Sequence, residues 1–115
     1  MVYIILGTGF EEAEALIPCD LLRRAGIEVK LAGIGSGCIT GGHGIRVSAD
    51  CTVEEMDTAQ AEMIVLPGGL GGVASIRGSA AALAAVRTLY RDGKYVAAIC
   101  AAPTILAELG ITEGR

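Results

Sequence analysis

The stretch that most constrains the fold lies between residues 95 and 110, where one hydrophobic pattern gives way to another at a cysteine. Tyr95–Ile99 is a short apolar run after the turn residues Asp92-Gly93, which predicts a buried strand. Pro103 suits the first turn of a helix, where its missing N–H leaves no bond unmade, and Gly110 suits its end. Cys100 therefore falls at a sharp strand-to-helix turn. This is the geometry of a nucleophile elbow, and the helix dipole there favours a thiolate. A buried, inert cysteine is the alternative that the local pattern leaves open.

The rest of the chain alternates between short apolar runs and helical patterns. Residues 11–25 and the segment after Ser79 predict helices, and residues 54–57 predict a short surface helix or turn. Cys38-Ile39 and Ile45–Ser48 predict a small antiparallel hairpin. Three further runs predict strands parallel to Tyr95–Ile99, namely Val2–Leu6, Glu28–Ala32 and Met63–Leu66. This order predicts a single α/β domain with a parallel sheet and helices on both faces.

Composition excludes several classes of function. The chain has 115 residues, enough for one domain, and a net charge of −4 that argues against nucleic acid. No basic run suggests a membrane surface, no apolar stretch could span a bilayer, and Met1 leads directly into a strand without a signal peptide. The four cysteines form no C-x-x-C pair, and one histidine cannot complete a zinc set. We therefore expect no metal and no cofactor, and a reducing cytoplasmic location.

The first helix begins with carboxylates. Gly7-Thr8-Gly9 suggests a dinucleotide loop, but the acidic residues that follow would repel a pyrophosphate. Glu11 and Glu12 are expected to be solvated partners of the helix dipole, whereas Glu14 lies near the carboxyl edge of the sheet, where α/β proteins place their sites.

Other features of the first helix and of the following loop carry weaker expectations. Pro18 removes the hydrogen bond to the carbonyl of Glu14 and predicts a kink or loosening there. Four apolar residues share one face of this helix, as the stripe of an amphipathic helix does: Ala13, Leu16, Ile17 and Leu21. His43, in the loop that follows the second strand, is expected to be solvent-exposed and not catalytic.

The third strand runs directly into Pro67-Gly68-Gly69. Glycines at such a turn expose backbone N–H groups without a side chain in the way, which is how an oxyanion hole can be built. An ordinary strand-to-helix loop explains the same residues, so the local pattern leaves both interpretations open.

Three motifs in the same order resemble the ThiJ/PfpI superfamily, in the branch of the Parkinson-associated deglycase and its bacterial homologues. They are residues 9–14 (GFEEAE), residues 65–69 (VLPGG) and residues 97–103 (AAICAAP). The resemblance covers the whole chain, and residues 17–27 and 48–50 also fit that branch. It implies a flavodoxin-like three-layer sandwich, a class I glutamine amidotransferase-like domain over residues 1–115, and a homodimer.

The resemblance also implies a site. Cys100 would be the reactive cysteine and Glu14 the acid that hydrogen-bonds its sulfur, with Gly68, Gly69 and the N–H of Ala101 binding an oxyanion. The implied substrates are small carbonyl compounds, 2-oxoaldehydes such as methylglyoxal, and glycation adducts. A redox-sensing binding protein or chaperone, regulated by oxidation of Cys100, is the alternative function. Ala101 stands where the cysteine-peptidase branch has a histidine, which argues against that branch.

The sequence departs from the family at its end. The family chain continues through a further strand-and-helix portion with a histidine beyond the cysteine. We therefore expect a domain truncated at its C-terminus, which would bind a second copy, a separate C-terminal fragment of the same protein, or both, because the open sheet would expose apolar surface.

Overall fold

A five-stranded parallel sheet forms the centre of the molecule in a computed structural model that describes residues 1–114. Its strand order is β5-β2-β1-β6-β7, and every neighbouring pair is parallel. The bounds are β1 Val2–Leu6, β2 Val29–Gly33, β5 Cys51–Thr52, β6 Met63–Leu66 and β7 Tyr95–Ala98. The predicted parallel sheet is confirmed, and β1 lies at its centre, between β2 and β6.

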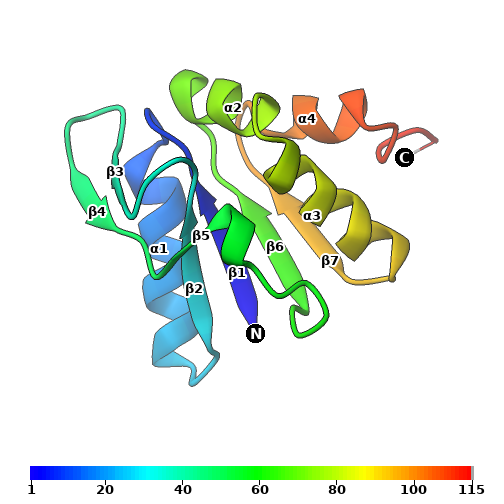
Figure 1. Cartoon of the computed structure of the whole chain (residues 1–115), viewed down its shortest axis with the longest axis horizontal. Coiled ribbons are helices and arrows are strands. Elements are labelled where there is room, and N and C mark those ends of the chain that lie inside the picture. The colour runs from blue at the N-terminus through cyan, green and yellow to red at the C-terminus, as the bar shows by residue number, and fades with distance from the viewer. Residues whose placement is uncertain (115) are drawn as a thin grey trace.

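Helices cover both faces of this sheet (Figure 1). Helix α1 (Glu12–Arg24) packs on one face over β1 and β2. The opposite face carries α2 (Leu70–Arg77), α3 (Ala80–Arg91), α4 (Pro103–Glu108) and the short 3-10 helix η1 (Val53–Glu55). The hairpin of β3 (Cys38–Thr40) and β4 (Arg46–Ser48) stands beside the N-terminal end of α1 (Figure 1). The arrangement is the expected flavodoxin-like three-layer sandwich.

Two apolar clusters, one on each face, hold the layers together. Because β1 is buried on both faces, its side chains alternate between the clusters: Ile4 joins the α1 side and Ile5 the opposite side, and both have 0% exposure. Burying one such side chain contributes about 1.5–3 kcal/mol. Both faces of the central strands are therefore core, which explains why the apolar run of β1 shows no alternation with polar residues.

Two elements were not predicted from the sequence. The segment after Gly69 forms a helix, α2, although it begins with Leu-Gly-Gly, where glycine is a weak helix former. Cys51–Thr52 forms β5, the edge strand beside β2. Helix α1 also runs without interruption from Glu12 to Arg24 through Pro18.

The apolar stripe predicted for α1 does not face the core. Ile17 and Leu21 are 57% and 59% exposed, whereas the buried residues of the helix are Glu12, Ala15 and Cys19. The buried set keeps helical spacing but is rotated from the stripe, because the small side chains of Ala15 and Cys19 let α1 pack closely on β1 and β2. Ile17 and Leu21 are left on the outside, whereas Leu16 and Leu22 are half-buried and pack against the core cluster on this face.

Candidate active site

Cys100 lies on a strained turn between β7 and α4. Its φ is 59°, and it is the one non-glycine residue with positive φ in the part of the chain that the structure describes. Ile99 still donates its N–H to the Leu66 carbonyl (3.2 Å), and the chain then turns sharply, with Pro103 opening α4 as predicted. The left-handed region costs a non-glycine residue of order 1–3 kcal/mol, so it is kept where surrounding structure or function requires it. The Cys100 residue is exposed, which excludes the buried, inert cysteine for this position.

Gly68 lies between Glu14 and Cys100, with no room for a side chain of its own. A Cβ placed on Gly68 would collide with Glu14 Oε1 and lie 2.8 Å from the Cβ of Cys100. Any side chain at residue 68 would therefore push these two groups apart. The turn that follows β6 thus brings the acid of α1 and the cysteine after β7 to one carboxyl edge of the sheet, as the parallel topology predicts.

The carboxyl group of Glu14 is held by the backbone of Gly68. Gly68 donates its N–H to Glu14 Oε1 (2.9 Å), and Glu14 donates its own N–H to Oε2 of Glu11, the N-cap of α1 (2.9 Å). Within residues 1–114, no hydrogen bond joins Glu14 directly to the Cys100 sulfur. The expected acid–thiol contact is replaced in this structure by an indirect one through Gly68.

The three predicted oxyanion donors differ in availability. The N–H of Gly68 is already given to Glu14, whereas neither the Gly69 N–H nor the Ala101 N–H donates to another group in the described part of the chain. Gly69 has a φ of +88°, and a Cβ there would lie 2.5 Å from the Gly9 carbonyl oxygen. Glycine at residue 69 is therefore required by both backbone conformation and space.

The other cysteines lie in different surroundings. Burial raises the pKa of the Cys19 thiol, in α1, and of the Cys51 thiol, in β5. Cys38 is exposed at the start of β3, where Arg46 approaches its sulfur at 3.9 Å. Cys100 is therefore the only one of the four that combines exposure with a strained elbow.

Glu12 is not the solvated residue that the sequence predicts; only 4% of it is exposed. Its Oε2 accepts the backbone N–H groups of His43 (2.7 Å) and Ile45 (3.2 Å), and its Oε1 lies 2.9 Å from His43 Nδ1. Burial alone would raise the pKa of Glu12, but these bonds outweigh burial and lower it to about 2. The His43 side chain is 73% exposed, and its bond to Glu12 raises its pKa.

One ligand atom each of Glu11, Glu12 and His43 lies within 4.8 Å of the others. This is the spacing that a metal ion needs, but the hydrogen bonds between His43 and Glu12 already account for it. No local sequence pattern indicates that Glu12 and His43 meet, because they lie 31 residues apart.

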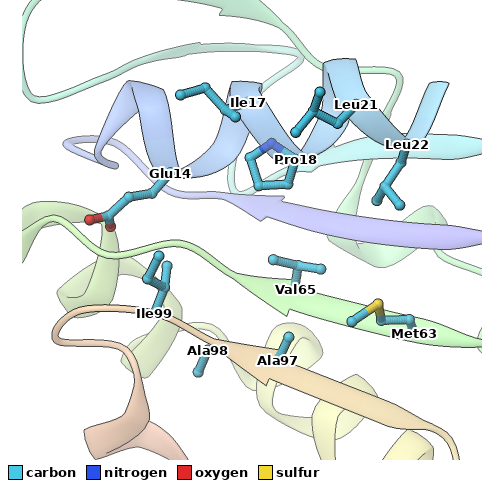
Figure 2. Close-up of a pocket in the computed structure, with 10 residues that line it drawn as sticks. All are labelled: Glu14, Ile17, Pro18, Leu21, Leu22, Met63, Val65, Ala97, Ala98 and Ile99. Atoms are coloured by element: carbon cyan, nitrogen blue, oxygen red, sulfur yellow. The ribbon is translucent and has the colours of Figure 1, made fainter. Parts of the chain in front are cut away.

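A groove of about 430 Å³ adjoins the site on the α1 face of the sheet. Figure 2 shows Glu14, Ile17 and Pro18 of α1 on one side of it and Ile99 with the residues of β6 and β7 on the other. Apart from Glu14, its lining is apolar. The groove therefore leads along the outer side of α1 to the carboxyl group of the site.

Fold and site together define an α/β protein of flavodoxin-like type with a cysteine at a nucleophile elbow. The chain belongs to the DJ-1/PfpI family, whose family model matches residues 1–115. It is 37% identical over 113 residues to the protein dj-1beta of Drosophila melanogaster, a match that covers 97% of this chain and 60% of that one. It is also 37% identical over 114 residues to a protein of Thermococcus kodakarensis named a deglycase, covering 99% of this chain and 68% of the relative.

Solved structures agree with this assignment. The crystal structure of the Drosophila protein superposes with a TM-score of 0.91 at 37% identity, covering 96% of this chain and 60% of that chain. The oxidized DJ-1 of Toxoplasma gondii superposes with a TM-score of 0.94 at 35% identity, covering 98% of this chain and 62% of that one. The chain thus spans about 60–68% of the length of these relatives. Within the described residues, no helix is long and apolar enough to cross a membrane.

Proposed function

We propose that this protein is a cysteine-dependent enzyme of the cytoplasm that acts on 2-oxoaldehydes or their glycation adducts, as a glyoxalase or deglycase. The observation that carries the proposal is the position of Cys100, exposed on its strained elbow and separated from the Glu14 carboxyl group only by Gly68. The relative named a deglycase supports the same class of chemistry.

The reaction begins when the Cys100 thiolate attacks the aldehyde carbon of the 2-oxoaldehyde. A C–S bond forms, the carbonyl oxygen takes up a proton, and the product is a hemithioacetal. Glu14 then moves a proton from this carbon to the neighbouring carbonyl carbon, with the hydroxyl and carbonyl exchanging places, which gives a thioester of a 2-hydroxy acid. Water cleaves the C–S bond, releases the 2-hydroxy acid and returns the thiol. The net reaction is therefore the addition of one water molecule to the 2-oxoaldehyde to give the 2-hydroxy acid.

The backbone donors take separate tasks in this scheme. The N–H groups of Gly69 and Ala101 stabilise the oxygen that becomes negative when sulfur attacks, since neither donates elsewhere in the described chain. Gly68 holds the Glu14 carboxyl group in position and can bind an oxyanion once Glu14 has taken up a proton. His43 contacts Glu11 and Glu12, so it does not stand in for the histidine that the family resemblance implies.

Turnover of methylglyoxal, followed by 2-hydroxy acid formation, tests the proposal. Cys100→Ser should abolish turnover, and Glu14→Gln should lower it about 10²-fold while alkylation of Cys100 falls much less, because the amide cannot shuttle a proton. Cys38→Ser is the matched control, since it removes another exposed thiol, and it should keep full activity. Equal activity in the Cys100→Ser protein would overturn the proposal.

A redox-sensing binding protein or chaperone is the second candidate function. It is favoured by the exposure of Cys100, since peroxide oxidises an accessible thiolate to sulfinate, which adds two oxygen atoms to the sulfur beside Gly68. A protein that shows no turnover but gains or loses a binding partner after peroxide treatment would support this candidate over the enzyme.

We also propose that the groove beside α1 is covered in the functional protein by a second copy of the chain, giving a homodimer. A separate segment that corresponds to the additional length of the relatives is the alternative occupant. The exposed apolar side chains of Ile17, Leu21 and Ile99 support such a cover, because exposed apolar surface of this kind marks interaction sites.

A further inference from the structure

A glycine-rich turn between β3 and β4 closes around the first turn of α1, with the Glu12 carboxylate at its centre. Both carboxylate oxygens are occupied: Oε2 accepts the N–H groups of His43 and Ile45, and Oε1 is bonded to His43 Nδ1. A Cβ on Gly41 would collide with the Glu12 carboxyl group, so glycine at residue 41 is what lets the turn close. We refer to Glu12 and His43, with the three hydrogen bonds that Glu12 forms to His43 and Ile45, as the clamp.

The same turn is tied to the loop between β1 and α1 by backbone hydrogen bonds. Gly9 donates its N–H to the Thr40 carbonyl (2.9 Å), and Gly42 donates its N–H to the Phe10 carbonyl (2.8 Å). That loop is in turn bonded to the turn that carries Gly68, because Glu11 donates its N–H to the Gly68 carbonyl (3.0 Å). Continuous hydrogen bonding therefore leads from His43 to the glycine that lies against Cys100.

Glu14 occupies the part of α1 that most needs such support. It is the third residue of the helix, and terminal turns of helices fray because their first N–H groups lack intrahelical partners. The cap supplied by Glu11 fixes one of these N–H groups, and the clamp fixes the other side of the same turn through Glu12. A reacting group displaced by about 1 Å can lose about 10²-fold in rate, so an acid at a helix terminus needs its backbone fixed.

We propose that Glu12 and His43 are positioning residues, which hold the first turn of α1 so that the Glu14 carboxyl group stays bonded to Gly68 beside Cys100. The catalytic part of this proposal, that the clamp raises the rate, rests on the proposed function. The structural part, that the clamp holds Glu14 against Gly68, does not. The clamp acts on Glu14 and touches neither the thiol nor the substrate. Two carboxylates face His43, those of Glu12 and the nearby Glu11, and both favour the protonated form of His43.

Hydrogen exchange of single backbone amides, measured by NMR, tests the structural part without any substrate. Glu12→Ala removes all three bonds and should speed exchange of the Gly68 and Glu14 N–H groups about tenfold, while amides of β1 stay unchanged. His43→Ala should have a smaller effect, since two backbone bonds to Glu12 remain, and His43→Gln should restore part of it through its side-chain amide. Unchanged exchange at Gly68 and Glu14 in the Glu12→Ala protein would overturn the proposal.

A double-mutant cycle tests the catalytic part. Glu12→Ala should lower kcat for methylglyoxal about tenfold, and KM much less, when Glu14 is present, but less than twofold in the Glu14→Gln background. Glu55→Ala is the matched control: Glu55, on η1, accepts the N–H and the hydroxyl of Thr52, the N-cap of η1, so its loss costs stability but should leave kcat unchanged. Equal losses in both backgrounds would show a merely structural role. If the natural protein shows no turnover, the proposed function fails, and the exchange experiment still decides whether the clamp exists.

Discussion

At the residue scale, Cys100 differs from the other three cysteines in both backbone conformation and exposure. It has a φ of 59° and is exposed, whereas Cys19 is buried and Cys51 is half-buried, and Cys38 lies on the hairpin. Reactivity of a thiol depends on its thiolate fraction and on access. The four thiols should therefore separate clearly in a competition experiment.

Under limiting iodoacetamide or peroxide at neutral pH, Cys100 should be modified first and Cys38 next. Cys19 and Cys51 should react last, because burial raises the pKa of both thiols and leaves less thiolate. Excess peroxide should take Cys100 on to sulfinate. Peptide mapping by mass spectrometry gives the order, and modification of Cys38 or Cys51 ahead of Cys100 would show that the elbow does not activate its thiol.

Glu12 makes folding stability depend on pH. The pKa of Glu12 in the folded protein, about 2, lies below the ordinary value. Its contribution to the free energy of unfolding is therefore complete above the ordinary pKa and is lost as pH falls towards 2. The pKa of His43 is raised, so its contribution is complete below the ordinary histidine value and is lost as pH rises through the folded pKa. The clamp should therefore contribute most between about pH 5 and pH 6.

Urea denaturation across this pH range provides the measurement. The free energy of unfolding should fall between about pH 4.5 and pH 2, and Glu12→Gln should flatten part of this decline. His43→Gln should leave the acid limb in place and remove part of the decline above about pH 6.5. An unchanged acid limb in the Glu12→Gln protein would contradict the buried carboxylate described above.

At the scale of elements, the turns that join strands to helices carry the most restrictive geometry. Gly69 caps α2 with a φ of +88°, and a Cβ there would lie 2.5 Å from the Gly9 carbonyl oxygen and 2.7 Å from the Glu11 nitrogen. Gly69→Ala should therefore destabilise the fold by at least about 2 kcal/mol, from backbone strain and overpacking together.

Gly26, after α1, is a matched control for this prediction. Its φ of +81° is nearly the same, but a Cβ there would meet nothing within 4 Å. Gly26→Ala should cost only the backbone strain, about 1–2 kcal/mol. Thermal or urea denaturation compares the two proteins, and equal losses would show that the close approach of the β1–α1 loop to Gly69 is not maintained in solution.

The sequence predicts elements well where the pattern is local. The apolar runs of β1 and β6 and the Cys100-to-Pro103 elbow are visible within a few residues, and all are confirmed. Residues 95–98 are confirmed as strand β7, but the predicted burial is wrong, because β7 is an edge strand and Tyr95 is 74% exposed. It fails for α2, because glycines weaken its helical pattern, and for β5, which is only two residues long. Which side of α1 faces the sheet, and the burial of Glu12, depend on contacts with residues distant in the sequence, such as that of Glu12 with His43. No local pattern indicates them.

At the scale of the whole molecule, the two faces of the sheet are covered unequally. Among the described residues, α2, α3, α4 and η1 pack on one face, while α1 is the one helix on the other, over β1 and β2 (Figure 1). This leaves a groove lined by residues of α1, β6 and β7 (Figure 2). The exposed side of α1 carries Ile17 and Leu21 beside the ion pair of Asp20 and Arg24 (3.0 Å).

The purified protein should therefore be a dimer at micromolar concentration, with α1 at its centre. Leu21→Glu should give monomers, because it places a charge in the apolar contact, whereas Leu70→Glu, at an 85% exposed leucine on α2, should leave the dimer intact. Native mass spectrometry distinguishes the possible occupants of the groove, since a second copy adds 11.7 kDa and a separate segment adds a different mass. A folded monomer with no bound segment would show that this apolar face needs no cover, and would remove the homodimer from the proposed function.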